Sequence, residues 1–111
     1  MELVTVITPT YNRKSELKNL YYSLCKQTNY DFRWLIVDDG SRDETEQYIE
    51  KIKREPKFKI EYIKKANGGK HTALNTGVKQ IKTELTMIVD SDDCLLPDAI
   101  EIISGIYSKL K

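Results

Sequence analysis

Short apolar segments alternate along this chain with longer segments in which apolar residues recur every three or four positions. The short segments predict buried strands, and the helical spacing predicts amphipathic helices between them. The expected strands cover residues 3–8, 32–37, 59–64 and 86–89. Such regular alternation predicts an α/β fold, with a mostly parallel, Rossmann-like sheet covered by helices on both faces.

Turn and capping residues set the expected ends of these elements. Pro9 is expected to end the first strand, and Ser15 is the expected N-cap of the first helix. Ser41 and Glu44 have the spacing of a capping box, which predicts that the second helix begins near Arg42. Lysines predict an edge position for the third strand. The last helix is expected to face the sheet with Ile100, Ile103, Tyr107 and Leu110.

Length and charge narrow the classes of function. A chain of 111 residues fits one small domain, and its net charge of +1 gives no general affinity for nucleic acid or acidic membranes. Its two cysteines lack the spacing of a zinc site or a disulfide framework, which favours a reducing compartment. The first residues lack a signal-peptide pattern, and no apolar segment is long enough to cross a bilayer. We therefore expect a soluble, cytoplasmic domain without a transmembrane segment.

The most informative segment is the apolar run at residues 87–89, which ends in Asp90, Asp92 and Asp93. A buried strand that delivers clustered carboxylates to one edge of a sheet suits a hard cation or a polar ligand. The structural alternative is that Asp92 or Asp93 caps the helix opened by Pro97. One cap needs only one carboxylate, and Asp90 lies too far upstream to share it. The pattern therefore favours a binding site.

An EF-hand calcium loop is excluded, although Asp90, Asp92 and Glu101 fall at its first, third and twelfth positions. Cys94 stands where an oxygen ligand is needed, and Leu95 replaces the turn glycine. The preceding segment also has the pattern of a strand rather than a helix.

Ligands of open α/β sheets bind outside the carboxyl ends of the strands, where the unusual chemistry of this chain collects. Asp39 is a candidate acceptor for a base imide N–H, Tyr11 for stacking on a base, and Asp90 for accepting from ribose hydroxyls. Asp92 is then free to hold Mg²⁺ or Mn²⁺, which suit oxygen ligands and bridge to substrate phosphates. Lys70 follows a glycine pair near a helix N-terminus and is a candidate phosphate contact.

Each candidate also has a structural alternative. Residues 38–41 form a good turn-and-cap sequence, so either aspartate taken alone suits capping as well as binding. A lone Tyr11 is more often packed in its loop, and a lone Lys70 is more often solvated. His71 has no partner group near it in sequence and is expected to pack or to lie at the surface. The shared location of the other candidates favours the binding interpretation.

Four ordered segments carry a likeness to a known family: residues 6–13 (VITPTYNR), 27–28 (QT), 36–43 (IVDDGSRD) and 90–93 (DSDD). Together they resemble family 2 glycosyltransferases of the GT-A fold, over nearly the whole chain. Ala73, Asn75 and Gly77 also look like the family's segment before its aspartate motif. The resemblance implies transfer of a sugar from a nucleotide-sugar, commonly a UDP-sugar, with inversion at the anomeric carbon. It also implies an acceptor hydroxyl, expected on a saccharide or a lipid-linked saccharide.

The same resemblance implies roles for individual residues. It implies uridine contacts at Pro9, Tyr11 and Asp39, and a basic donor-site contact at Lys70. It also implies a ribose or metal-site contact at Asp90. Asp92 matches the metal-binding aspartate of a DXD motif. The implied cofactor is Mn²⁺ or Mg²⁺. The family's catalytic base and acceptor site lie in a following segment that has no counterpart before Lys111.

We therefore expect residues 1–111 to be the donor-binding part of a larger enzyme and to be inactive in transfer alone. The full-length protein is expected in the cytoplasm, with the inner face of a membrane as a peripheral location. A non-catalytic nucleotide-binding or metal-binding module is the first alternative. A phospho-receiver domain is the second, but it needs an acidic pair after the first strand, where this chain has Pro9, Thr10 and Tyr11.

Overall fold

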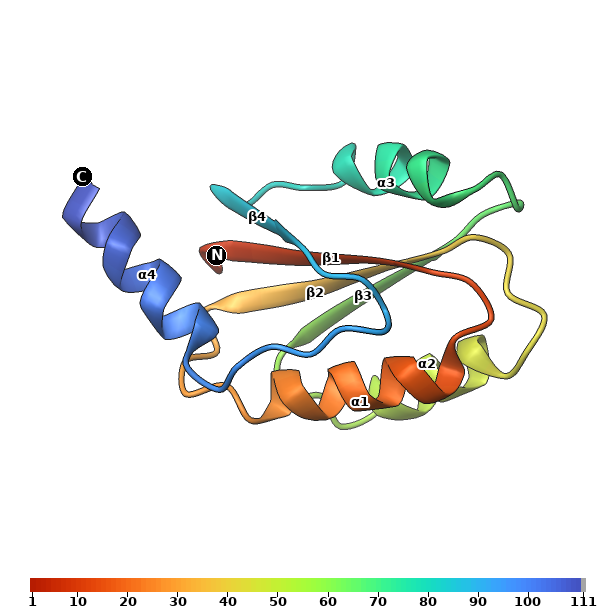
Figure 1. The fold of residues 1–111 in the computed structure, drawn as a ribbon, viewed down its shortest axis with the longest axis horizontal. Coiled ribbons are helices and arrows are strands. Elements are labelled where there is room, and N and C mark those ends of the chain that lie inside the picture. The colour runs from red at the N-terminus through yellow and green to blue at the C-terminus, as the bar shows by residue number, and fades with distance from the viewer. Residues whose placement is uncertain (111) are drawn as a thin grey trace.

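A computed structural model describes residues 1–110 and contains one four-stranded sheet (Figure 1). Its strands are β1 (Val4–Thr10), β2 (Phe32–Asp38), β3 (Lys59–Lys64) and β4 (Leu85–Ile88). All neighbours pair in parallel, in the order β3-β2-β1-β4. The sheet confirms the expected architecture and the edge position of the third strand.

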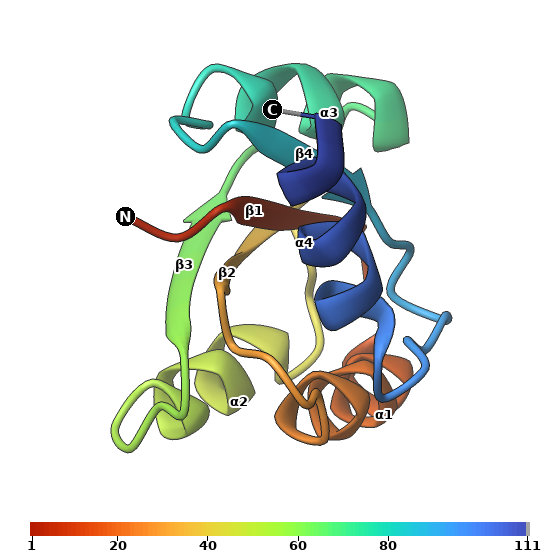
Figure 2. The ribbon, with the colours of Figure 1, turned by 90° about the vertical axis from the view of Figure 1, so that its left-hand side faces the viewer.

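Helices cover both faces of the sheet, as the alternating pattern predicts. Two of them, α1 (Lys14–Cys25) and α2 (Thr45–Ile52), lie on one face, and α3 (Lys70–Val78) lies on the other (Figures 1 and 2). The last helix, α4 (Ala99–Leu110), extends outward beside the end of the sheet where β1 begins. The connections therefore change face between the neighbouring strands β1 and β4, and such a switch point is where open α/β sheets bind ligands.

Two apolar clusters hold these layers together. The larger lies between the sheet and the helices α1 and α2, and Trp34 at its centre stacks on Tyr21 with ring centroids 6.1 Å apart. The Trp34 indole N–H donates to Thr8 Oγ1 at 2.9 Å, so its polar atom is paired inside the cluster. The smaller cluster joins Ile7 of β1 to Ala73 of α3. The two clusters pack helices against both faces of the sheet.

Gly77 explains how closely α3 approaches the sheet. A Cβ at this position would lie 2.5 Å from Ile7 Cδ1 and 2.8 Å from Val37 Cγ2. Glycine weakens an isolated helix, so local propensity alone gives no reason for it here. The structure shows that the missing side chain lets the helix pack directly on two core residues.

The first strand does not end at Pro9, and that prediction is wrong. β1 continues to Thr10, and Pro9 lies in register with Val37 of β2. The pairing of β1 with β4 ends at Ile7, so the ring nitrogen of Pro9 faces the side where β4 has already stopped. Proline fits there because the position needs no N–H donor. The same early end of β4 opens a crevice beside β1.

Both predicted helix caps are replaced by contacts between loops. The N-cap of α1 is Arg13 rather than Ser15, and the Lys14 N–H donates to Asp43 Oδ2 at 3.3 Å. Ser41 forms no capping box, because its Oγ accepts from the Asn12 N–H at 2.9 Å. α2 therefore begins later than expected.

A short side-chain contact marks the true beginning of α2 at Thr45. Asp43 Oδ1 accepts from the Thr45 N–H at 3.0 Å and from its hydroxyl at 2.5 Å. Burial raises the pKa of the Asp43 carboxyl, but these hydrogen bonds outweigh it and hold the pKa below its ordinary value.

The last helix faces the sheet less fully than its pattern predicts. Ile100 is fully buried and Ile103 packs against the larger cluster, as expected. Leu110 is 79% exposed, so its predicted inward position is wrong. The helix moves away from the sheet along its length, and only its first turns can reach the core (Figure 1).

Candidate functional site

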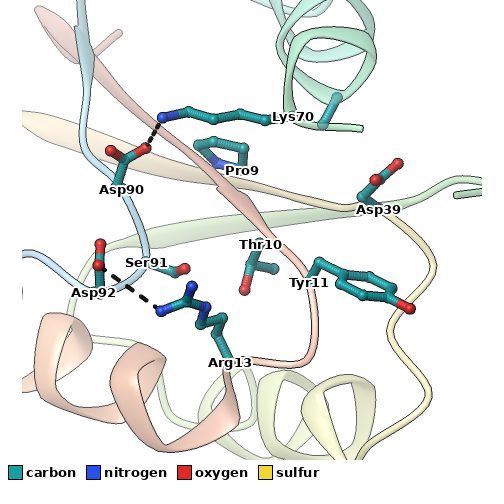
Figure 3. A pocket seen from close by; sticks show the side chains of 10 residues that line it. Pro9, Thr10, Tyr11, Arg13, Asp39, Lys70, Asp90, Ser91 and Asp92 are labelled. Atoms are coloured by element: carbon teal, nitrogen blue, oxygen red, sulfur yellow. Dashed lines mark ion pairs between the residues drawn. The ribbon is translucent and has the colours of Figure 1, made fainter. Parts of the chain in front are cut away.

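A cavity of about 300 Å³ opens where β1 and β4 end (Figure 3). It is lined by Pro9, Thr10, Tyr11, Arg13, Asp39, Lys70, Ala73, Asp90, Ser91 and Asp92. All six site residues expected from the sequence are in this set. They come from the four segments that follow or end the strands, and the sheet brings them to one place.

Asp39 lines one end of the cavity, and donors from the loop after β3 hold it there. We call Asp39 and these donors, Lys65, Gly68 and Gly69, the buried end. The Asp39 side chain is 6% exposed. Its Oδ1 accepts from Lys65 Nζ at 2.7 Å and from the Gly68 N–H at 2.9 Å, and its Oδ2 accepts from the Gly69 N–H at 2.7 Å. The carboxylate is therefore held in one orientation by three donors.

These contacts also decide the charge of Asp39. Burial raises the pKa of the carboxyl, but the hydrogen bonds from Lys65, Gly69 and Gly68 outweigh burial and leave the pKa below its ordinary value. Asp39 is consequently an ionised group that can only accept hydrogen bonds.

The two neighbouring aspartates have different roles, which the sequence left open. Asp38 is fully buried, with Oδ1 accepting from the Ser41 N–H at 2.8 Å and Oδ2 accepting from the Tyr62 hydroxyl. It forms the turn at the end of β2. Asp39 lines the cavity instead. Gly40, which follows Asp39, has φ of +81°, a left-handed conformation that glycine adopts without steric cost in this turn.

The loop that carries Tyr11 is fixed by its next residue. Asn12 has φ of +51°, and its Oδ1 accepts from the Arg42 N–H at 2.8 Å and from the Asp43 N–H at 3.3 Å. Asparagine tolerates this left-handed conformation better than most residues. Tyr11 is 42% exposed and lines the cavity. An exposed aromatic on a fixed loop offers a flat surface for a ring of a ligand.

Asp90 and Asp92 line the other end of the cavity, and Asp93 lies beside them; we call these three residues the acidic end. One carboxylate oxygen from each lies within 4.8 Å of the others. Lys70 Nζ is 2.6 Å from Asp90 Oδ1, and Arg13 lies 3.8 Å from Asp92 Oδ2, as the dashed lines in Figure 3 show. These side chains are about half exposed, in contrast with Asp39.

The acidic residues do not cap the following helix. α4 begins at Ala99, well beyond Asp93 along the chain. Three carboxylates within one small volume offer the hard oxygen donors that Mg²⁺ and Mn²⁺ prefer, so the residues present fit a divalent metal. Asp93 joins the two aspartates that the sequence analysis singled out.

Gln27 holds the segment that leads away from the acidic end. Its Nε2 donates to Leu96 O at 2.7 Å and to Ser23 O at 3.2 Å, while its Oε1 accepts from the Ile100 N–H at 3.1 Å. The neighbouring Thr28 N–H donates to Pro97 O at 2.9 Å. A buried glutamine with every polar atom paired therefore ties the end of α1 to the start of α4.

Sequence reasoning missed four residues of the cavity wall as site residues: Thr10, Arg13, Ala73 and Ser91. Thr10 is buried, and its Oγ1 has no hydrogen-bond partner within residues 1–110. Thr10 is the last residue of β1, and its place at the carboxyl end of a strand is the signal that could have indicated it. Arg13 stands in the same loop as Tyr11, but only the fold reveals that it reaches Asp92.

A model of the family "Glycosyl transferase family 2" matches residues 5–108 of this chain. The chain is also 33% identical over 99 residues to the poly(ribitol-phosphate) beta-N-acetylglucosaminyltransferase TarS of Staphylococcus aureus. That match covers 87% of this chain and 17% of TarS.

Solved structures of glycosyltransferases are also similar to this chain. The crystal structure of S. aureus TarS 1-349 in complex with UDP-GlcNAc superposes with a TM-score of 0.85 at 31% identity, covering 98% of this chain and 32% of that one. A mannosyltransferase from Pyrobaculum calidifontis, in complex with GDP-Man and Mn²⁺, has a TM-score of 0.76 at 26% identity, covering 82% of this chain and 28% of that one.

The chain spans less than a third of the length of these proteins. Within residues 1–110, no helix combines the length and the apolar character that crossing a membrane requires.

Proposed function

The chain belongs to glycosyltransferase family 2, and from this premise we propose that its cavity binds a nucleotide-sugar donor, a UDP-sugar, together with a divalent metal ion. The observation that carries the proposal is the convergence of a buried ionised acceptor, an exposed aromatic ring and an exposed acidic cluster on one cavity at the switch point of the sheet.

The buried end suits the uracil ring. Asp39 is an oriented acceptor for an imide N–H, while Tyr11 and Pro9 offer apolar walls to the faces and edges of the ring. TarS, which is similar in both sequence and structure, has been solved with UDP-GlcNAc. That complex supports uridine as the nucleoside for this chain.

The acidic end suits the metal and the ribose. We assign Asp92 as a metal ligand, supported by Asp93, and Asp90 to the ribose hydroxyls or to the metal. The similar mannosyltransferase was solved with Mn²⁺, which supports Mn²⁺ or Mg²⁺ as the cofactor. When bound, such a cation offsets the negative charge of a departing nucleoside diphosphate.

Lys70 and Arg13 are the cationic side chains of the cavity. Each already faces a carboxylate of the acidic end, and both are exposed enough to turn toward the phosphates of a donor. Lys70 also stands in the first turn of α3, where backbone N–H groups favour anions. We assign Lys70 as the main diphosphate contact and Arg13 as a second one.

In the whole protein, we propose that the bound sugar passes to an acceptor hydroxyl with inversion at the anomeric carbon. That reaction needs a general base to take the proton of the acceptor, and we place this base outside residues 1–111. The chain is then the donor-binding part, inactive in transfer alone. Its two free thiols, Cys25 and Cys94, support a cytoplasmic location, with peripheral membrane attachment as a property of the whole protein.

Calorimetric titration of UDP into the chain tests this proposal. We expect binding with Mn²⁺, weaker binding in EDTA, and weaker binding by Asp92→Asn in the presence of Mn²⁺. Asp98→Asn serves as the matched control, because Asp98 is exposed and lies outside the cavity. Equal UDP affinity in all of these samples would contradict the metal-assisted site, and GDP binding tighter than UDP would contradict the uridine assignment.

A further inference from the structure

Lys65 has an unusual environment for a lysine that follows an edge strand. Its side chain is 19% exposed, and Nζ donates to Asp39 Oδ1 at 2.7 Å, to Thr72 Oγ1 at 3.0 Å and to Ala66 O at 2.5 Å. An ammonium group has three donors, so every one is used inside the protein. Lys65 is therefore committed to the protein itself and is not available to bind phosphate.

The loop between Lys65 and Lys70 has little freedom to move around this contact. Asn67 Nδ2 donates to Asp39 O at 3.1 Å, and Thr72 Oγ1 donates to Gly69 O at 2.7 Å. Any side chain at Gly68 would start 2.9 Å from Thr72 Oγ1. Lys65 lies between Asp39 and Thr72, so it joins the carboxylate to the first turn of α3.

These contacts leave the Asp39 carboxylate with few free positions for accepting hydrogen bonds. An ionised carboxylate offers about four acceptor positions. Three are filled by Lys65, Gly68 and Gly69, which leaves one, on Oδ2. Because the group is held by its donors, that remaining position has a fixed direction. It can receive a donor N–H but repels a ring nitrogen that carries a lone pair.

We propose that Lys65 is a positioning residue for base selection: it fixes Asp39 so that the remaining acceptor position admits uracil, whose ring N3 carries a hydrogen, and rejects cytosine, whose N3 does not. This inference rests on the proposed function, since it takes Asp39 to face the base of a bound nucleotide. It adds a residue that never touches the ligand and acts only through Asp39.

UDP and CDP form a matched pair of probes, because they share ribose and phosphates and are nearly the same size. Their dissociation constants are measured by calorimetry with Mn²⁺ for the wild-type chain, Lys65→Met and Lys65→Arg. Lys64→Met is the matched control, because Lys64 is the adjacent lysine and bonds Glu46 on the surface at 3.0 Å.

We expect the wild type to bind UDP at least about tenfold more tightly than CDP, the scale of one hydrogen bond to a charged group. Lys65→Met should weaken UDP about tenfold and leave CDP unchanged, because only UDP uses the positioned acceptor. Lys65→Arg should regain part of the preference, and Lys64→Met should keep all of it. Thr72→Val removes one anchor of Lys65 and should narrow the preference to a smaller degree.

Three results would overturn the inference. If Lys65→Met weakens UDP and CDP equally, Lys65 acts only through its charge. If the variant keeps the full preference, Asp39 does not depend on Lys65. If the wild type binds UDP and CDP equally, Asp39 does not select the base. Failure of the wild type to bind UDP at all is a different outcome, which overturns the donor proposal itself and this inference with it.

Discussion

The two ends of the cavity are both built from aspartates, yet the fold treats them in opposite ways. At the buried end, Asp39 is 6% exposed and accepts three hydrogen bonds from a tightly packed loop. At the acidic end, Asp92 is 55% exposed, and its ion-pair contact with Arg13 is 3.8 Å long. Asp39 is therefore part of the folded architecture, while Asp92 is free to serve a ligand.

This difference separates two kinds of effect. A change at the buried end removes bonds that hold the protein together, so folding stability should fall along with binding. A change at the acidic end removes exposed charge, which contributes little to stability. The contrast predicts that stability and metal binding respond to different residues, and the following substitutions test that separation.

Asp39→Asn should have the largest effect on folding. The amide loses the charge that Lys65 compensates and turns an NH₂ group toward N–H donors, so we expect a loss of about 2–4 kcal/mol in the free energy of unfolding. Urea denaturation followed by the fluorescence of Trp34, the single tryptophan, measures it. Asp98→Asn is the exposed control and should stay within about 0.5 kcal/mol. A stable Asp39→Asn would show that the buried end is not part of the architecture.

Acid should weaken the same contact. The pKa of Asp39 lies below its ordinary value of 3.8, because its hydrogen bonds outweigh the effect of burial. The unfolded chain therefore takes up this proton first as the pH falls. The stabilising contribution is complete above 3.8 and is lost as the pH drops through the lower folded value. Unfolding free energies from pH 7 to pH 2 should fall less steeply for Asp39→Asn than for the wild type.

Gln27→Ala should have an intermediate effect, because Gln27 ties the end of α1 to the segment that follows the acidic end. It removes three side-chain bonds, one of them to the Ile100 N–H, so we expect a loss of about 1–3 kcal/mol in stability. The segment after the acidic end should also loosen, seen as faster hydrogen exchange at Leu95 and Ile100 and weaker Mn²⁺ binding. Gln47→Ala, at an exposed position of α2, is the control. Unchanged hydrogen exchange at these two residues would show that Gln27 does not hold this segment in place.

Asp92→Asn should have the smallest effect on folding and a clear one on the metal. We expect stability to change by less than about 0.5 kcal/mol, because the side chain is exposed and its ion pair is long. Mn²⁺ affinity should fall at least about tenfold, since even the groups that support metal ligands matter by this much. Thermal unfolding and Mn²⁺ titration on one preparation give both values. A large loss of stability would contradict the claimed difference between the two ends of the cavity.

The sequence predicts the parts of this molecule that depend on local patterns. Apolar periodicity locates the four strands and the helix faces, and the acidic residues after β4 are visible because an apolar run stops there. It predicts the position of Asp39 and Lys70 in one cavity, because the carboxyl ends of parallel strands meet at one edge.

Contacts between distant loops cannot be predicted from local sequence patterns. Ser41 has the right spacing for a capping box, but its hydroxyl oxygen accepts from the Asn12 N–H. Asp43 accepts a hydrogen bond at the start of α1 as well as at the start of α2. The bond between Lys65 and Asp39 spans 26 residues. Lys65 is one of 18 basic residues, and nothing local distinguishes it from the solvated ones.

The most direct test of the two-ended site compares uridine with UDP, each titrated with and without Mn²⁺. Uridine brings only the base and the ribose, while UDP also brings the phosphates that a metal ion at the acidic end would bind. We predict that Mn²⁺ leaves the uridine dissociation constant unchanged within about twofold and strengthens UDP at least about tenfold. Mn²⁺-dependent uridine binding, or UDP binding that ignores Mn²⁺, would contradict the account.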